Sequence, residues 1–455
     1  MLRMLRGRSL ARLRREVEPV EPDALARFLI AWHGIASRRR GAEALLDAVE
    51  QLQGAAVPAS VLEAEILPAR LEDYEPSMLD MLLAAGDVVW VGVERLGERD
   101  GRVALYLTGQ PQRLRLPRST QPAAAGRARE PAPADGRARA ILECLRTQGA
   151  SFFSAIHEAA GGGFPGETVD TLWGLVWQGL VTNDTLHPLR AFIQPPDTRA
   201  HRPSRIPVPR TRRLVPPTAE GRWSLVAEAT DLSVTEWAAA LSQQLLTRYG
   251  VVTRETVAAE AVAGGFSAVY QVLKTMEDAG RVRRGYFVSG LGGAQFAAPA
   301  ALDLLRTLRD PPESRHSVAL AATDPANPYG AIASWPARDA AGEDRDTRRT
   351  TRSAGARVVL VDGRLAGYVP RGDRELVLFA PDDEPLRTQL VREVARILLH
   401  GALAREEGRR GMLLEEINGE PAVAHRAARL FVEEGFRSTG MGLQARPDRD
   451  APQAD

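Results

Sequence analysis

The sequence repeats one pattern three times between residues 42 and 297, and this repeat limits the fold more than any other feature. Each copy has three amphipathic segments of helical period, a glycine after the third segment, a valine two residues later and a strand-like run. Glycine in this place accepts the left-handed backbone conformation that ends a helix. The glycine and valine pairs are Gly86 and Val88, Gly179 and Val181, and Gly280 and Val282. The repeat predicts three units of one architecture.

Each unit is expected to contain three helices and a two-stranded wing. The predicted helices are 42–53, 59–67 and 75–85 in the first copy, 137–147, 153–159 and 167–178 in the second, and 235–249, 254–262 and 267–279 in the third. The strand-like runs are VVWVGV with GRVALYL, then TNDTLHPLRAF, then the stretch around a glycine turn at 290–293. This order is the winged-helix plan, a relative of the helix-turn-helix. Three-helix units with a hairpin also serve as purely protein-binding modules, which is the alternative reading of a single copy.

The rest of the chain completes a prediction of the α+β class, with tandem winged-helix domains followed by a small β-barrel with packed helices. The winged helices are expected at 41–107, 137–193 and 223–310, after an N-terminal helical segment at 1–40. Segments 108–136 and 194–222 are rich in Pro, Ala and Arg and are predicted to be a linker and an extended strap. Strand-like runs with turn signals predict the barrel at 311–383, and helices, a short strand and a tail are expected at 384–455.

Composition excludes several classes of site. The net charge of +1 means that any argument for nucleic-acid binding must be local. The single cysteine, Cys144, excludes a disulfide framework and a cysteine-cluster zinc site, and the histidines lack metal-ligand spacing. The only lysine, Lys274, lies within a predicted helix, and no phosphate-binding Gly-x-x-x-x-Gly-Lys-Ser/Thr loop is present. We therefore expect no metal, no cofactor and no ATPase site in this chain. No apolar run has the length of a membrane span, so we expect a cytoplasmic protein without a membrane partner.

The best local signal for nucleic-acid binding lies in the third copy. The predicted helix 267–279 has an inward apolar stripe, made of Val269, Val272, Leu273 and Met276. Its outward side chains can donate to phosphates or base edges, and three arginines follow at the start of the wing. The candidate DNA-binding residues here are Ser267, Gln271, Lys274, Arg281, Arg283 and Arg284. The acidic residues Glu277 and Asp278 lie beside them and weaken the signal.

The strap carries a second candidate group, Arg210, Arg212 and Arg213. An extended segment with arginines at this density is suited to following a phosphate backbone. The alternative is that these arginines are solvated and cover apolar surface with their stems.

Several long phrases of the sequence resemble the C-terminal half of the Lhr family, the large helicase-related bacterial DNA helicases. The resemblance covers about residues 8–444 and is carried by RFLIAWHGI, ILPARLEDYEPSMLDMLLAAGDVVWVGV, DGRVALYL, LWGLVWQGLVTNDTLHPLRA, RRLVPPTAEGRWSLV, RYGVVTRETVAAE, FSAVYQVLKTMEDAGRVRRGYFVSGLGGAQFA and DPANPYGA. In that family two RecA-like ATPase domains, a winged helix and a further domain come first, and they have no counterpart in this sequence.

The resemblance implies an architecture similar to the AlkZ-like DNA glycosylases, with segment 1–40 as the remnant of a preceding domain. It implies uracil-DNA glycosylase activity on single-stranded or unwound DNA, the Lhr helicase core as a partner in cis or trans, and self-assembly into a homo-oligomer. It places no catalytic residue. Asp448 and Asp450 lie in the terminal tail, and Asp324 and Asp362 each have a turn-forming explanation.

These observations predict a DNA-binding module with glycosylase activity. The first alternative is a non-catalytic platform that binds DNA and oligomerises for the helicase half. The second is a winged-helix transcription regulator, and the spread of repeats through the chain argues against it.

Overall fold

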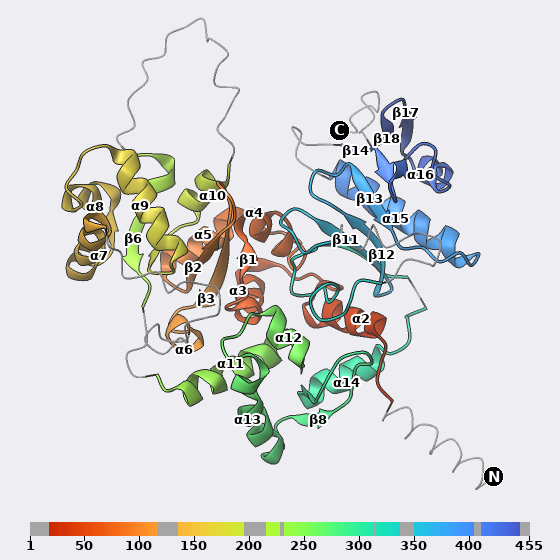
Figure 1. Ribbon diagram of the computed structural model, residues 1–455, viewed down its shortest axis with the longest axis horizontal. Helices are drawn as coiled ribbons and strands as arrows, with labels where there is room; N and C mark the ends of the chain where they lie inside the picture. Colours follow the sequence, from red (N-terminus) through yellow and green to blue (C-terminus); the bar gives the residue numbers. More distant parts are fainter. Residues whose placement is uncertain are drawn as a thin grey trace, which may run out of the picture. The chain divides into compact units, whose positions relative to one another are not determined.

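The structure is a computed structural model, and it describes residues 18–115, 135–194, 215–227, 232–313, 315–336, 350–404 and 411–445 (Figure 1). The chain divides into two compact units. One unit comprises 1–37, 249–259 and 273–455, and the other comprises 38–248 and 260–272. The division passes through the third copy of the repeat, so this copy contributes to both units.

The first copy folds as a winged helix within the second of these units. Its elements are α3 (Gly41–Leu52), β1 (Val57–Pro58), α4 (Ala59–Val61) continued by the π-helical turn η1 (Leu62–Ile66), α5 (Pro76–Ala85), β2 (Val88–Arg95) and β3 (Gly101–Leu107). The strands form an antiparallel sheet in the order β1-β3-β2. Gly86 ends α5 with φ of 83°, the left-handed conformation expected from the repeat.

The second copy has the same plan, with two departures from the expected pattern. Its elements are α7 (Gly136–Gln148), β4 (Ser151–Phe152), α8 (Phe153–Ala159), α9 (Pro165–Trp177), β5 (Val181–Asn183), α10 (His187–Ile193), the 3-10 turn η4 (Pro217–Ala219) and β6 (Arg222–Leu225). The run TNDTLHPLRAF is strand only at its start, because Pro188 lies in the first turn of a helix, where its missing N–H costs nothing.

The second departure concerns β6, which we expected at the start of the third winged helix. Instead it lies between β4 and β5 in the sheet of the second copy, with Trp223 opposite both Ser151 and Asn183. Burial of the Trp223 side chain stabilises this pairing. The expected boundary at residue 223 is therefore wrong, since the strand that closes the second wing follows the strap.

The third copy repeats the element order again. It consists of α11 (Val234–Tyr249), β7 (Val251–Val252), α12 (Arg254–Ala259), α13 (Gly265–Asp278), β8 (Arg283–Gly285) and β9 (Gln295–Ala297). The sheet order β7-β9-β8 matches that of the first two copies. Three winged helices in one chain confirm the prediction of the α+β class.

The strands after the third copy form an open sheet, where a small barrel was expected. After α14 (Pro299–Thr307), the elements are β10 (Ser317–Ala321), β11 (Arg357–Val361), β12 (Arg364–Val369), β13 (Glu375–Leu378), α15 (Leu386–Leu403), β14 (Met412–Leu414), β15 (Glu416–Ile417), β16 (Glu420–Pro421), α16 (Ala428–Glu433), β17 (Arg437–Thr439) and β18 (Gly442–Ala445). The six-stranded sheet runs β10-β11-β12-β13-β15-β16, and its two edge strands are not paired with each other. The apolar side of α15 packs on this sheet and on the small sheet β14-β18-β17. The helix thus buries the apolar face of the sheet, so the strands need not close into a barrel to bury it.

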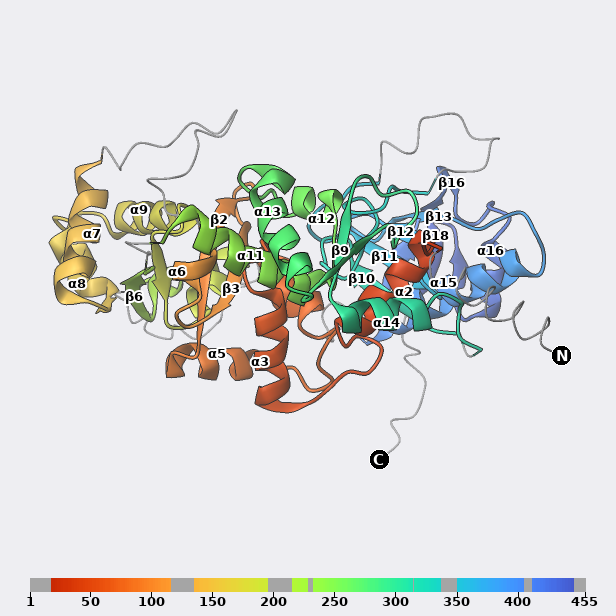
Figure 2. The same ribbon diagram turned by 90° about the horizontal axis from the view of Figure 1, so that it is seen from below.

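Helix α2 (Pro22–Trp32) is an integral part of its unit, whereas we expected residues 1–40 to be a separate N-terminal segment. It lies beside α14 in both ribbon views (Figures 1 and 2). Arg27 donates through Nε to the carbonyl of Leu308 at 3.0 Å and through Nη1 to that of Asp362 at 2.6 Å. The hydroxyl of Tyr329 donates to Asp23 at 2.9 Å. These contacts connect α2 to segments about 300 residues away in sequence.

The start of the expected linker 108–136 is also ordered against its unit. Helix α6 (Pro111–Leu114) is followed by Arg115, which donates to the carbonyl of Gly179 at 2.9 Å, and Trp237 donates to the carbonyl of Leu114 at 3.1 Å.

Among the residues that the structure describes, no helix is long and apolar enough to cross a membrane.

Candidate nucleic-acid interface

Helix α13 separates its side chains into two faces as the sequence predicts. Val269, Leu273 and Met276 are buried, and Val272 is partly buried. The candidate residues Ser267, Gln271 and Lys274 are exposed on the opposite side of the same helix. Their spacing of three and four residues places them in one row along the helix surface. This row can donate hydrogen bonds to phosphates or base edges.

The backbone turn after α13 fixes where the wing arginines begin. Gly280 has φ of 72°, its N–H donates to the carbonyl of Glu277 at 2.8 Å, and the N–H of Arg281 donates to that of Met276 at 2.8 Å. This pair of bonds is a Schellman cap, which reverses the chain directly after the helix. β8 then follows two residues later with Arg283 and Arg284.

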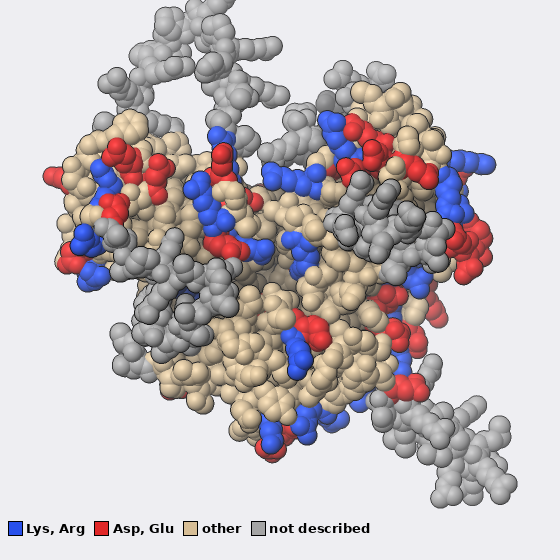
Figure 3. Space-filling model, viewed as in Figure 1, with Lys and Arg blue, Asp and Glu red and all other residues tan. Residues whose placement is uncertain are grey.

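The three wing arginines are exposed, and one of them is tied to the helix. Arg284 Nε lies 3.2 Å from a carboxylate oxygen of Glu277, near the end of α13. Figure 3 shows Lys and Arg side chains gathered where α13 and β8 lie, next to a small group of acidic side chains. The acidic neighbour thus partly neutralises Arg284, while Arg283 makes no ion pair with any described residue.

The tip of the third wing is held against the start of the described chain. The N–H of Val20 donates to the carbonyl of Phe287 at 2.7 Å, and the N–H of Ser289 donates to that of Val20 at 2.8 Å. The buried side chain of Gln295 accepts from the N–H groups of Phe287 and Val288, each at 2.8 Å. The backbone of the wing from 287 to 289 is therefore used internally, whereas the arginine-bearing base of the wing is exposed.

The corresponding helices of the first two copies have a different chemistry. Neither α5 nor α9 contains Lys or Arg, and their outward or partly exposed side chains include Asp80, Glu167 and Asp170. Carboxylates repel phosphates, so these two helices are poor candidates for DNA contact. Of the three recognition-type helices, α13 has the polar face suited to nucleic acid.

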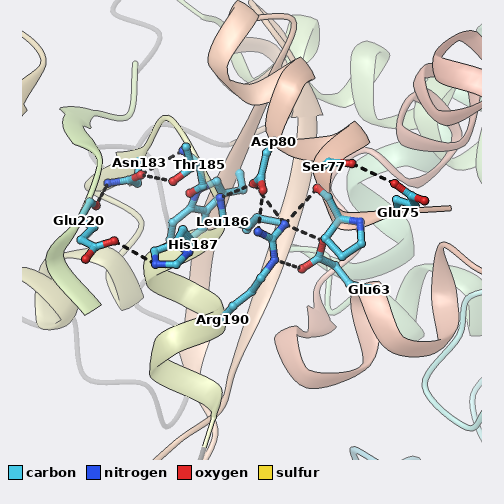
Figure 4. A network of polar contacts seen from close by, with 12 residues as sticks. Glu63, Glu75, Ser77, Asp80, Asn183, Thr185, Leu186, His187, Arg190 and Glu220 are labelled. Carbon is cyan, nitrogen blue, oxygen red and sulfur yellow. Dashed lines mark hydrogen bonds and ion pairs between the residues drawn. The ribbon is translucent and has the colours of Figure 1, made fainter. Parts of the chain in front are cut away.

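Asp80 instead belongs to an ion-pair cluster that joins the first two winged helices (Figure 4). Arg190, from α10, lies 2.7 Å from Glu63 and 2.6 Å from Asp80. Tyr74 donates its hydroxyl to Glu63 at 2.5 Å, and burial together with the Glu63 charge raises the pKa of this tyrosine. The carboxylates are engaged by an arginine that stays charged, so the cluster is suited to holding two domains together and not to acid–base chemistry.

The other arginines and aspartates that the sequence singled out either make contacts within the fold or lie outside the described residues. Asp324 is fully buried and accepts from the N–H of Ala326 at 2.8 Å, and Asp362 accepts from the N–H of His316 at 2.8 Å. The Asp324 contact forms a turn, as the sequence suggested. Asp362 lies in the turn between β11 and β12 with φ of 51°, but its side-chain contact is long-range, because His316 is 46 residues away. Arg210, Arg212 and Arg213, like Asp448 and Asp450, lie outside the described residues. In the described part of the chain, no group of three or more His, Cys, Asp or Glu residues could hold a metal ion.

Sequence reasoning missed a groove beside β8. Tyr286 of the wing and the arginines Arg306 and Arg309, at the end of α14 and just after it, line a cavity of about 270 Å³ together with Arg283 and Arg284. The sequence offered one sign of this groove, the two arginines Arg306 and Arg309 three residues apart. It did not show that α14, which carries Arg306, lies next to the wing.

Three winged helices, of which one has a basic and polar recognition face, define a tandem winged-helix protein. Two segments, residues 20–108 and 231–317, each match a family model described as the winged-helix domain of the large helicase-related protein. The first match begins before α2 and ends after β3.

Two relatives match almost the whole chain. A Mycolicibacterium smegmatis protein named "Lhr helicase/ probable uracil glycosylase" is 40% identical over 468 residues, which cover 98% of this chain and 29% of that protein. An Escherichia coli protein named "Lhr helicase/uracil glycosylase" is 36% identical over 479 residues, which cover 97% of this chain and 30% of that protein. The chain thus spans less than a third of the length of these curated relatives. It belongs to the large helicase-related family and corresponds to the C-terminal part of its relatives.

Proposed function

We propose that this chain is a DNA-binding module of an Lhr-type protein and that α13 with the base of its wing forms the contact surface. The observation that carries the proposal is the exposed row Ser267, Gln271 and Lys274, which is followed by arginines on β8. The winged-helix family matches at 20–108 and 231–317 support it. Phosphate contacts by these arginines supply affinity without sequence preference.

Fluorescence anisotropy with labelled duplex and single-stranded DNA tests this surface. Replacing Arg281, Arg283 and Arg284 with Ala should weaken binding similarly for all sequences. It should also reduce the slope of log K against log salt by about 0.7–0.9 for each phosphate that the variant no longer neutralises.

The matched control replaces Arg39, Arg40 and Arg146 with Ala, which removes the same charge from three exposed arginines elsewhere. If both triple variants lose the same affinity for DNA, the loss is caused by the change in net charge. This result would contradict a contact surface at this wing.

We further propose that the module has uracil-DNA glycosylase activity on single-stranded DNA. The names of the two relatives support this activity, since both include uracil glycosylase. Such an enzyme must extract its base from the stack, and extraction costs least from single-stranded DNA, so a glycosylase combined with a helicase is physically reasonable. No described residue is assigned to catalysis.

The test is incubation of the purified chain with single-stranded DNA that contains one uracil, followed by alkali. Strand breakage above that of a uracil-free control is expected. DNA binding without breakage would favour the alternative, a non-catalytic platform for binding and oligomerisation. Self-association, and association with the helicase core, stay predictions that sedimentation velocity can test.

A further inference from the structure

We infer that the groove between the third wing and α14 binds one unstacked nucleotide of a single DNA strand, with its base on Tyr286 and its phosphate between Arg283 and Arg306. The inference rests on the proposed DNA-binding function and adds a specific subsite for single strands. The groove is lined by Glu18, Val20, Arg283, Arg284, Gly285, Tyr286, Phe287, Leu302, Leu305, Arg306 and Arg309, all within one unit.

The groove combines an apolar interior with a cationic rim. Val20, Leu302 and Leu305 are buried side chains that contribute apolar lining, and Phe287 is partly buried. Four arginines and a single carboxylate, Glu18, supply the charge. A volume of about 270 Å³ lies just below the range of roughly 300–1,000 Å³ that is typical of small-molecule sites, which suits a single base with its backbone.

Tyr286 is positioned in advance as a stacking surface. It is 49% exposed, although it is a large aromatic residue, and its hydroxyl accepts a hydrogen bond from the N–H of Gly290 at 3.1 Å. The backbone that follows it is fixed by the bonds of Phe287 to Val20 and Gln295. A ring held in this way loses little conformational entropy when a base stacks on it.

The arginines of the groove differ in how firmly the fold holds them. Arg309 donates to the carbonyl of Glu18 and lies 3.7 Å from its carboxylate, and Arg284 is paired with Glu277. Arg283 is exposed, and Arg306 lies 4.0 Å from Asp303, whose side chain is 77% exposed. Such a long ion pair with an exposed carboxylate contributes little to stability, and a phosphate that accepts hydrogen bonds from Arg306 is bound more strongly when it is shared with Arg283.

The chemistry of the groove favours a single strand over a duplex. In a duplex the faces of the bases are covered by their neighbours, so only phosphates would reach the rim. A base of a single strand, by contrast, is free to enter the apolar interior and to stack on the exposed aromatic ring. Proteins commonly bind single strands in this way, with bases stacked on aromatic side chains and cations along the backbone.

The experiment uses the full chain and oligothymidylate labelled with fluorescein, with a second oligonucleotide that contains one 2-aminopurine. Tyr286→Leu should weaken single-strand binding roughly 5- to 100-fold, the range expected for loss of one base–aromatic stack, and should reduce quenching of 2-aminopurine. Its duplex affinity should change less than twofold. Tyr286→Phe keeps the ring and removes only the hydrogen bond with Gly290, so it should bind like the parent chain. Arg283→Gln combined with Arg306→Gln should also weaken single-strand binding, whereas Arg39→Gln combined with Arg40→Gln should not.

The outcomes separate this inference from the proposed function. If Gln271→Ala with Lys274→Ala weakens duplex binding while Tyr286→Leu leaves single-strand binding and quenching intact, the groove is not the subsite and the DNA-binding function stands. If Tyr286→Leu weakens duplex and single strand equally, the groove has no preference for single strands and the inference is overturned. If the parent chain binds neither DNA, the proposed function fails and the inference fails with it. A thermal melt of Tyr286→Leu that matches the parent verifies that each result reflects binding.

Discussion

The side chain of Arg190 serves structure, because it pairs with Glu63 and Asp80 of the first winged helix. It is 21% exposed, and its two partners Glu63 and Asp80 are 16% and 29% exposed, so the cluster is largely shielded from water. Its removal would leave the carboxylates of Glu63 and Asp80 without their cation, and only Glu63 would keep the hydrogen bond from Tyr74. A fully buried pair broken in this way loses roughly 3–5 kcal/mol, and partial exposure reduces the cost.

We therefore expect Arg190→Ala to lower the free energy of unfolding of this unit by about 2–3 kcal/mol. Urea unfolding followed by tryptophan fluorescence measures it, because Trp90, Trp173, Trp177, Trp223 and Trp237 all lie in the same unit as Arg190. The control is Arg146→Ala, which breaks an exposed pair with Glu143 and should cost less than about 0.5 kcal/mol. An Arg190→Ala variant as stable as this control would contradict a structural role for the cluster.

At the scale of elements, the packing of the first winged helix on the second depends on a close approach of β2 to α9. A Cβ added to Gly92 would lie 2.4 Å from the carbonyl oxygen of Val176, and one added to Gly101 would lie 2.4 Å from the ring of Trp177. Trp173 stacks on Phe192, and Trp177 makes tilted ring contacts with both. Positions 92 and 101 therefore need glycine because there is no room for a Cβ atom, and not because of an unusual backbone conformation.

Gly92→Ala should destabilise the unit by about 1–3 kcal/mol, the usual cost of overpacking an interior. The same urea experiment measures it. Gly174→Ala is the matched control, because it adds the same methyl group to an exposed position of α9, where a Cβ would meet nothing within 4 Å. This control should stabilise the unit by about 0.5–1 kcal/mol through higher helix propensity. A Gly92→Ala chain at least as stable as Gly174→Ala would show that the two domains do not pack this closely.

At the scale of the whole molecule, DNA binding by this chain should be independent of ATP. The sequence contains no phosphate-binding loop, and the candidate surface is made by α13, β8 and the groove beside them. Anisotropy titrations with and without Mg·ATP, at matched ionic strength, should give the same affinity for DNA. A change in affinity with ATP that an equal concentration of sodium sulfate does not reproduce would reveal a nucleotide site that the sequence does not indicate.

The elements of the winged helices were predictable because local contacts define them. The three glycines Gly86, Gly179 and Gly280 each have positive φ, as expected from their place after a helix. The apolar stripe of α13 is buried and its polar row is exposed, because a period of 3.6 residues determines which side chains share a face. The candidate row on α13 was therefore placed correctly before any tertiary contact was known, although its role in DNA binding stays a proposal.

The contacts between distant segments were not predictable. β6 closes the second wing after a strap of more than twenty residues, and the strands after residue 311 form an open sheet where a barrel was expected. The groove joins residues of β8, α14 and the start of the described chain. In each case the partners are separated by tens to hundreds of residues, so no local period or spacing identifies them.

By itself, the sequence determined the helices, their caps, the threefold winged-helix repeat and the family, since these follow from residues within a few positions of one another or from long matching phrases. Only the tertiary structure decided which strand closes each sheet, where α2 packs, that Arg190 joins two domains and that Tyr286 and Arg306 line one groove. The physical reason is that ion pairs, sheet neighbours and grooves depend on which surfaces meet, and the chain brings these surfaces together only when its hydrophobic faces are buried.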